Sequence, residues 1–159
     1  MNPASLPFHF EIGPYQIRLP RHAEISAEVK KPPSYAVQTT TTHWQIELGR
    51  FRLFAHLDPL NGLGELKSFI DFSTKGNVTT PPIQVNGIDG VTHGDYGPPR
   101  TWIDWWFKKG DTMICLCLQS TSFPMTEPTK EEIAEHEAIV ESLRNCRDSP
   151  NPEVPSASF

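Results

Sequence analysis

The chain lacks the short motifs that most often mark an enzyme. Its 159 residues contain no P-loop, no GxGxxG dinucleotide fingerprint, no GxSxG nucleophile elbow and no HExxH zinc motif. A pair of catalytic carboxylates could still meet in space without a motif, but no pair is singled out by the sequence. We therefore expect a non-enzymatic protein, and we assign no catalytic residue, metal ligand or cofactor.

Clustered positive charge and long apolar runs are also missing. The chain has 14 Lys and Arg against 19 Asp and Glu, a net charge of −5. No basic cluster is available to meet a phosphate backbone, so nucleic-acid binding is not expected. No apolar run approaches the ~18 residues that a membrane-spanning helix needs. Acidic residues gather near the C-terminus, either as a solvated helix face or as a surface for a basic partner.

Cysteine is scarce, with three residues in the chain. Cys115 and Cys117 are separated by one residue in an apolar run, a poor geometry for pairing with each other, so free thiols in a reducing compartment are expected. The opening MNPASLPFHFEIG has neither the basic stretch nor the apolar stretch of a secretory signal. These features together predict a cytoplasmic location.

Proline, in contrast, is abundant, with 16 residues that mostly flank apolar runs. This distribution is typical of many short elements separated by turns. The hydrophobic fraction of 37% predicts one globular domain, over residues 1–146. Residues 147–159 hold three prolines and little to bury, so we predict a disordered tail there.

Alternation of apolar and polar residues predicts short strands along most of the chain. The expected strands are 8–12, 15–19, the two arms of a hairpin over 39–57 with its turn at Gly49–Arg50, one or two strands over 83–93, 100–107 and 112–120. In the 83–93 segment, Asn86–Gly87 forms a two-residue turn or Gly87 forms a bulge. Residues 21–37 are expected to be an irregular connection.

Two helices are expected between and after these strands. One lies within 58–77, where apolar residues recur at helical spacing. The other lies within 127–145, with Thr129 and Glu132 as a capping box and Arg144 in the last turn. On its apolar stripe, His136 is expected to pack against the core and bond to a backbone carbonyl rather than to act in catalysis. The order of elements predicts an α+β fold with a largely antiparallel sheet of about 6–8 strands covered by helices.

The segment WIDWWF is the most unusual part of the chain. Alternation places Trp102, Asp104 and Trp106 on one face of a strand, and the opposite face is fully apolar. The neighbouring MICLCL is apolar on both faces, so both strands are expected to lie centrally in the sheet. A buried carboxylate needs a partner. Asp104 therefore either pairs internally, with Arg100 or a lysine, or lies in an open aromatic groove.

Two further groups allow a functional and a structural interpretation. Cys115 and Cys117, with Cys146 and a histidine, resemble a zinc ligand set, but Cys inside an apolar strand more often acts as a small hydrophobe. His93 and Asp95 resemble a metal-binding or acid–base pair, but the surrounding THGDYGPP is equally typical of a turn. We favour the structural interpretation for both.

The order of elements resembles the Mog1/PsbP/DcrB-like α/β/α sandwich. The matching segments are YQIRLP, then the hairpin and helix, then IQVNGIDG, WIDWWF, MICLCLQST and a closing helix that ends in AIVESLR. The resemblance covers about residues 8–145 and rests on element order and apolar pattern. Families with this fold include accessory, chaperone and binding proteins, among them small cytosolic chaperones of secreted effectors, and they generally lack a catalytic motif. The chain departs from the pattern in its proline content and its tail.

These observations favour a cytosolic protein-binding module, such as an adaptor, an effector chaperone or a toxin-neutralising protein, whose partner is another protein. One alternative is a small-ligand binder or enzyme that uses the face of Trp102, Asp104 and Trp106 with the His93–Asp95 loop. Another is a structural subunit of a homo-oligomer, for example a homodimer. The candidate binding residues are Trp102, Asp104, Trp106, Arg100, Tyr96, His93, Glu135 and Glu141.

Overall fold

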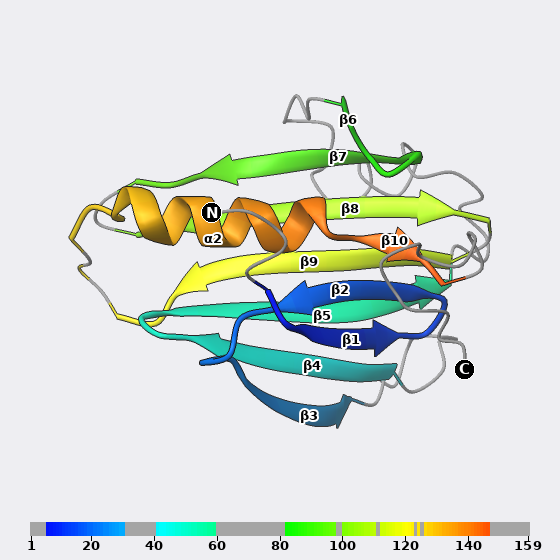
Figure 1. The fold of residues 1–159 in the computed structure, drawn as a ribbon, viewed down its shortest axis with the longest axis horizontal. Coiled ribbons are helices and arrows are strands. Elements are labelled where there is room, and N and C mark those ends of the chain that lie inside the picture. The colour runs from blue at the N-terminus through cyan, green and yellow to red at the C-terminus, as the bar shows by residue number, and fades with distance from the viewer. Residues whose placement is uncertain are drawn as a thin grey trace, which may run out of the picture.

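The computed structural model describes residues 6–30, 41–59, 82–97, 100–110, 112–122, 124 and 126–146. These residues form two layers (Figure 1). The larger layer is a seven-stranded sheet in which every pair of neighbours is antiparallel. Its strands are, in sheet order, β3 (Glu24–Lys30), β4 (Thr41–Leu48), β5 (Phe51–Pro59), β9 (Thr112–Ser120), β8 (Trp102–Lys109), β7 (Ile88–Asp95) and β6 (Pro82–Val85).

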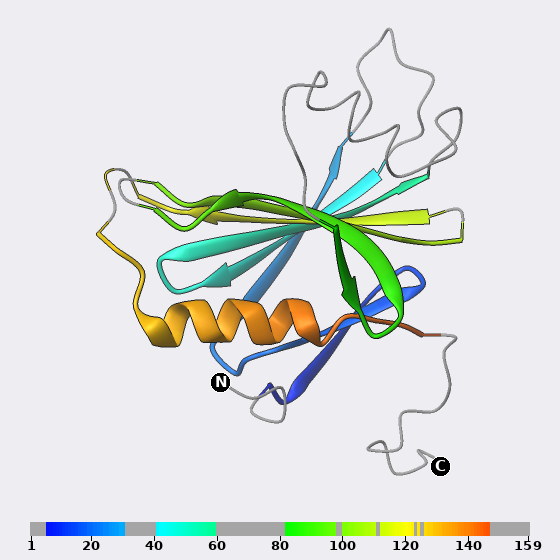
Figure 2. The same ribbon diagram turned by 90° about the horizontal axis from the view of Figure 1, so that it is seen from above.

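The smaller layer lies against one face of that sheet (Figure 2). It combines a helix with a three-stranded antiparallel sheet. Its elements are the helix α2 (Lys130–Glu141) and, in sheet order, β1 (Phe8–Ile12), β2 (Tyr15–Leu19) and β10 (Arg144–Asn145). In Figure 1, α2 crosses in front of β8 and β9, and the β1–β2 hairpin lies in front of β5 and β4. We call the covered side of the large sheet its inner face and the other side its outer face.

The two layers enclose one main core. The alternation predicted for β8 holds, because Ile103, Trp105 and Phe107 point inward and belong to this core. The other layer contributes apolar side chains from both of its parts, for example Ile17 of β2 and Ile139 of α2. Burying apolar area on both sides of this interface is the main force that holds the layers together.

A two-residue turn joins β6 to β7. Asn86 and Gly87 both have left-handed backbone angles, with φ of 50° and 79°. Val85 pairs directly with Ile88 across them, the geometry of a type I′ hairpin. The two-residue turn is therefore correct and the bulge at Gly87 is not. The Asn86 side chain donates hydrogen bonds from Nδ2 to the carbonyls of Leu143 (2.6 Å) and Glu141 (3.1 Å), which tie this turn to the end of α2.

The Tyr15 hydroxyl joins the small sheet to the turn between β8 and β9. The side chain is fully buried, and its oxygen accepts a hydrogen bond from the backbone N–H of Lys109 at 2.8 Å. It donates in turn to the carbonyl of Thr112. A buried tyrosine hydroxyl needs hydrogen-bond partners, and here the backbone of this turn supplies both of them.

The helix α2 begins as the sequence predicts. Thr129 is its N-cap, and the reciprocal hydrogen bonds with Glu132 that define a capping box are both present. Its end differs from the prediction, because the helix stops at Glu141 and Arg144 lies in β10. Arg144 therefore does not complement the helix dipole from the last turn.

The α+β class and a largely antiparallel sheet of about 6–8 strands are confirmed, since the large sheet has seven strands, but the separate three-stranded sheet was not predicted. Residues 24–30, within the predicted irregular connection, form the edge strand β3, and two residues after α2 form β10. The helix predicted within 58–77 lies outside the described residues, except that Asp58 and Pro59 belong to β5. The tail predicted for 147–159 also lies outside them. The described helix α2 covers only the β8 and β9 part of the inner face, and the β1–β2 hairpin lies over β5 and β4 (Figure 1).

No helix in the described ranges combines the length and the apolar character that crossing a membrane requires.

Candidate functional site

Five of the predicted binding residues lie together on or beside the outer face of the large sheet. Trp102, Asp104 and Trp106 alternate outward along β8, as predicted. His93 of β7 is directly opposite Asp104 in the strand register. Arg100 precedes β8 and stacks on Trp102. We call these five residues the Trp102 patch.

Trp102 is the exposed aromatic residue of this patch. Its side chain is 40% exposed, and it is one of three large apolar side chains described as exposed. The indole Nε1–H donates a hydrogen bond to Oδ2 of Asp104 at 3.0 Å. The guanidinium carbon of Arg100 lies 4.8 Å from the ring centroid, a cation–π distance. The ring is therefore held in one orientation from its edge and from its face while it remains accessible to solvent.

Asp104 does not make the internal pair with Arg100 or a lysine that the sequence suggested. Its carboxylate accepts the Trp102 bond, and Oδ2 lies 3.9 Å from Nδ1 of His93, beyond hydrogen-bond distance. Its side chain keeps about a fifth of its exposure. Asp104 thus has a hydrogen-bond partner within the protein, as one alternative required, and is partly exposed at an aromatic surface, as the other required.

Exposure changes along the outer face from one end of β8 to the other. At the far end from Trp102, the outward side chains Met113 and Cys115 of β9 are buried and form a small cluster with Trp106. The imidazole of His93 stacks near Trp106, with ring centroids 6.5 Å apart. The patch therefore runs from a closed apolar end at Trp106 to an open end at Trp102.

Cys117 lies directly opposite Asp104 in the middle of the outer face. Burial raises the pKa of its thiol to about 12, a hydrogen bond from Gln119 works against this, and the neighbouring Asp104 carboxylate adds to it. The Gln119 amide nitrogen donates to Sγ at 3.3 Å. A thiol with this pKa stays protonated at neutral pH and is a poor nucleophile and a poor metal ligand.

Among the described residues, no group of three His, Cys, Asp or Glu side chains is arranged to hold a metal ion. The three cysteines are all free thiols.

The interpretation of His93–Asp95 as part of a turn is wrong, because both residues lie within β7. They do not form a pair either. His93 is opposite Asp104, whereas Asp95 is opposite Trp102 and its carboxylate accepts the backbone N–H of Tyr96 at 2.7 Å.

The remaining predicted residues do not join the patch. Tyr96 packs against the main core, and its hydroxyl lies 3.1 Å from Nδ1 of His136. His136 is buried as predicted, but its partner is this hydroxyl and not a backbone carbonyl. Burial lowers the pKa of His136 to about 4. The contact lies in the interior and away from the outer face.

Glu135 and Glu141 are carried by α2, on the opposite side of the large sheet from the Trp102 patch (Figure 2). Glu135 is not freely solvated, because its carboxylate bonds Nε2 of His22 at 2.9 Å and its side chain is 13% exposed. Glu141 is exposed. The two glutamates therefore do not form one surface with the tryptophans.

Sequence reasoning missed the neighbours of the patch on β4 and β5. Arg52 bonds Glu47 across these two strands, and its guanidinium carbon lies 5.9 Å from the ring centroid of Phe54. Phe54 is opposite Cys117, so its ring extends the apolar part of the outer face. The signal was available, because Phe54 is an apolar residue on the polar face of the predicted hairpin.

No known protein-family profile matches the chain, and no characterised protein sequence matches it. Solved structures do resemble it. Cyanobacterial PsbP (CyanoP) from Synechocystis sp. PCC 6803 aligns with a TM-score of 0.52 and 8% identity over 87% of this chain and 91% of that one. A protein from Bacteroides thetaiotaomicron VPI-5482 aligns with a TM-score of 0.48 and 12% identity over 88% of this chain. The alignment spans 48% of the Bacteroides protein, about half of its length.

The likeness to CyanoP shows that the chain has a PsbP-like fold, as the order of its elements predicted. At this level of identity the likeness concerns the fold alone, since one fold carries many functions.

Proposed function

We propose that the chain is a protein-binding module and that the Trp102 patch is its contact surface. The observation that carries this proposal is the state of Trp102, whose ring is oriented by Asp104 and Arg100 and yet exposed on a sheet face. Tryptophan and arginine are the residues most enriched among the side chains that dominate binding energy at protein interfaces. A ring that is already ordered loses little further freedom when a partner covers it.

The polar groups around Trp102 suit a protein partner. Asp104 bonds the edge of the ring and Arg100 lies over its face, while His93 is opposite Asp104 on the next strand. This places hydrogen-bonding groups of both charge signs at the rim of an apolar centre, the usual composition of a protein interface. The geometry of Asp104 and His93 offers less to an enzyme, because the two groups are separated by 3.9 Å and Asp104 already accepts the indole N–H.

We also propose a location and a role for this module. We place it in the cytoplasm, in keeping with its free cysteines, as an adaptor, an effector chaperone or a toxin-neutralising protein. These roles need a stable complex and no chemistry. The net charge of −5 gives a basic partner a favourable long-range attraction.

Affinity purification of three tagged proteins from the native host tests the proposal. Wild type, Trp102→Ala and Ile25→Ala are compared by quantitative mass spectrometry of bound proteins. Ile25 is the matched control because it is 43% exposed on the edge strand β3. We expect a stoichiometric protein that binds wild type and Ile25→Ala equally and binds Trp102→Ala at least about tenfold more weakly.

Two checks accompany this comparison. Thermal unfolding must show that Trp102→Ala is folded, and Arg100→Ala should weaken binding in the same direction through loss of the cation–π contact. A partner that is retained by Trp102→Ala, or lost equally from Ile25→Ala, would show that another surface binds it. A bound small molecule in place of a protein would refute the proposal.

A further inference from the structure

Two arginines at the outer face lie over aromatic rings and differ in their ionic partners. The guanidinium carbon of Arg52 is 5.9 Å from the ring centroid of Phe54, and its Nε donates to the carboxylate of Glu47. The guanidinium carbon of Arg100 is 4.8 Å from the ring centroid of Trp102. Within the described part of the chain, the Arg100 guanidinium makes no ion pair and no hydrogen bond. Its charge and its N–H groups are therefore available to another molecule.

The contact with Trp102 prepares Arg100 for a planar, charged group. A guanidinium over an aromatic ring uses its face for the ring and keeps its N–H groups, which lie in its plane, for hydrogen bonds. Two parallel N–H groups match the two oxygens of a carboxylate. Arg100 is exposed, so a partner can reach these donors. Because the ring already holds the side chain, little rotamer freedom remains to be lost on binding.

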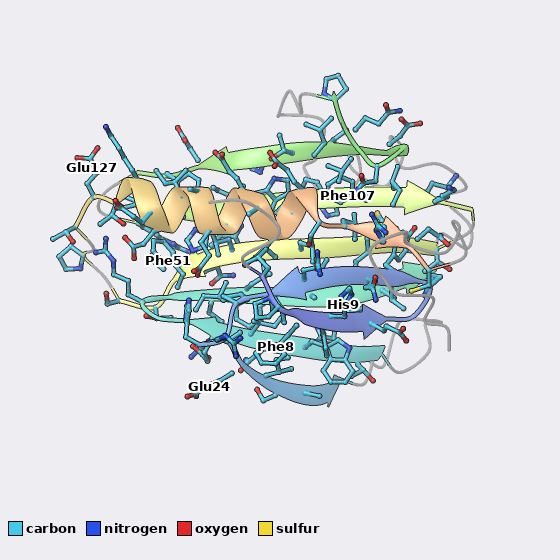
Figure 3. All side chains as sticks on the ribbon, viewed as in Figure 1. Phe8, His9, Glu24, Phe51, Phe107 and Glu127 are labelled. Carbon is cyan, nitrogen blue, oxygen red and sulfur yellow. The ribbon has the colours of Figure 1, made fainter. Side chains whose placement is uncertain are left out.

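The apolar surface beside Arg100 is the ring of Trp102, which is exposed on the outer face. Figure 3 shows where other large aromatic side chains lie. Phe51 and Phe107 are on the inner face beneath the small layer and are fully buried, whereas Phe8 is exposed but belongs to β1 of the small layer. Trp102 therefore offers exposed apolar surface directly beside a cation that is not paired within the described residues.

The carboxylates near the ring restrict the partner to a single negative charge. Asp104 accepts the indole N–H of Trp102 at 3.0 Å, and Asp95 is directly opposite Trp102 in the strand register. A phosphate group uses the same donors as a carboxylate but carries a charge of about −1.5 to −2 at neutral pH. The single charge of Arg100 leaves part of that charge uncompensated near two carboxylates, which is unfavourable. A carboxylate, in contrast, is neutralised by Arg100 alone.

We propose that the Trp102 patch recognises an acidic residue of its protein partner, an aspartate or a glutamate that is next to an apolar residue. The carboxylate pairs with Arg100 while the apolar side chain packs on Trp102. This inference rests on the proposed function, because it names the kind of segment that the protein-binding surface takes. It is compatible with a partner that is basic overall, since the acid acts at one contact and the net charge of −5 acts at long range.

Binding of two short peptides tests the proposal. Acetyl-Leu-Glu-Leu-amide and acetyl-Leu-Gln-Leu-amide have nearly the same shape and differ in one carboxylate. The NMR resonance of the Trp102 indole N–H, identified by its absence in Trp102→Phe, reports the binding of each peptide. We expect the acidic peptide to bind wild type at least about fivefold more tightly than the neutral peptide.

Three arginine variants assign this preference to one side chain. In Arg100→Gln the two peptides should bind equally, because the unpaired cation is gone. Arg100→Lys keeps the charge but loses the two parallel N–H groups, so a preference of only about twofold should remain. Arg52→Gln is the matched control, since Arg52 also lies over a ring of the outer face but is already paired with Glu47. It should keep the full preference, and thermal unfolding shows whether each variant is folded.

Several results would overturn the proposal. Equal binding of both peptides to wild type would refute it, as would an unchanged Trp102 resonance at millimolar peptide or a preference that survives Arg100→Gln. A preference kept in full by Arg100→Lys would refute the paired N–H geometry. Tighter binding of acetyl-Leu-phosphoserine-Leu-amide than of the glutamate peptide would assign the guanidinium to phosphate instead.

The proposed function has a separate test, which is the loss of the partner from Trp102→Ala in the affinity purification. If that loss is found and the peptides bind equally, protein binding stands and the acidic class of partner fails. If Trp102→Ala retains the partner, the proposed function itself fails.

Discussion

Tyr96 Oη and His136 Nδ1 lie 3.1 Å apart and join the segment after β7 to α2. The two rings are nearly parallel, at an interplanar angle of 9°, and Phe51 meets the other side of the imidazole edge-on. His136 is therefore enclosed by aromatic side chains and has a neutral hydroxyl as its partner. This surrounding favours the uncharged imidazole.

The first prediction is that His136 makes stability depend on pH. Burial lowers its pKa from 6.5 to about 4, so the unfolded chain takes up this proton more readily than the folded chain. The stabilisation is complete above about pH 6.5 and is lost as the pH falls towards 4. The loss amounts to about 3 kcal/mol. The free energy of unfolding, measured in urea at several pH values in this range, should depend less steeply on pH in His136→Phe than in wild type.

Two controls separate His136 from other groups. Tyr96→Phe should cost about 1 kcal/mol at neutral pH through the lost hydrogen bond, and it should keep the pH dependence. Glu132, whose pKa is lowered from 4.5 to about 2 mainly by its hydrogen bond with Arg50, loses its contribution in a lower pH window. If the free energy of unfolding of His136→Phe depends on pH as steeply as that of wild type, the imidazole is not the titrating group.

The second prediction concerns the start of α2. Thr129→Ala removes the oxygen that accepts the Glu132 backbone N–H at 3.1 Å. We expect a loss of about 1 kcal/mol in the free energy of unfolding, measured by chemical denaturation. Lys130→Ala, an exposed change one residue later, should have an effect below about 0.5 kcal/mol. Equal effects of the two changes would contradict the capping role.

The third prediction concerns Asn86, whose amide donates hydrogen bonds to carbonyls at the end of α2. Asn86→Ala removes the hydrogen bonds to two carbonyls at the end of the helix. It also places at φ 50° a residue that tolerates a left-handed backbone less well than asparagine does. The expected loss is about 1–2 kcal/mol. Gln84→Ala, on the same hairpin, removes an exposed bond to Asp89 and should change stability little. Thermal unfolding distinguishes the two, and a similar Tm for both variants would argue against the prediction.

The fourth prediction is an order of thiol reactivity. Cys146 is exposed, whereas Cys115 is buried and the pKa of Cys117 is raised to about 12. Iodoacetamide at pH 8 should modify Cys146 first, and the other two only after unfolding in urea. Mass spectrometry of digested samples over time gives the rates. Rapid modification of Cys117 in the folded protein would contradict its raised pKa.

Local signals in the sequence predicted most of the described elements. The hairpin at Gly49–Arg50, the alternation of β8 and the capping box of α2 are all encoded by residues close together in the chain. The strand β3 was missed because its apolar alternation is short and is followed by two prolines. Its pairing with β4, and not its own propensity, establishes it as a strand.

The candidate site was likewise predictable only where its residues lie close together in the chain. Trp102, Asp104 and Trp106 belong to one strand, so their common face follows from a period of two. Tyr96 and Glu135 were grouped with them on chemistry alone, and their actual partners, His136 and His22, come from distant elements. Contacts of this kind depend on how the layers pack, which no local pattern specifies.

The pairing of β10 with β2 has a consequence for the nascent chain during translation. Asn145 is opposite Tyr15, so a strand that is synthesised before any strand of the large sheet pairs with the last described strand. The seven strands of the large sheet are all synthesised by Ser120, before α2 exists. Until α2 emerges, part of the apolar inner face is uncovered, and such transient surfaces are prone to aggregate. Ribosome-bound chains that end before residue 130 should therefore be the stage at which this protein most needs a cellular chaperone.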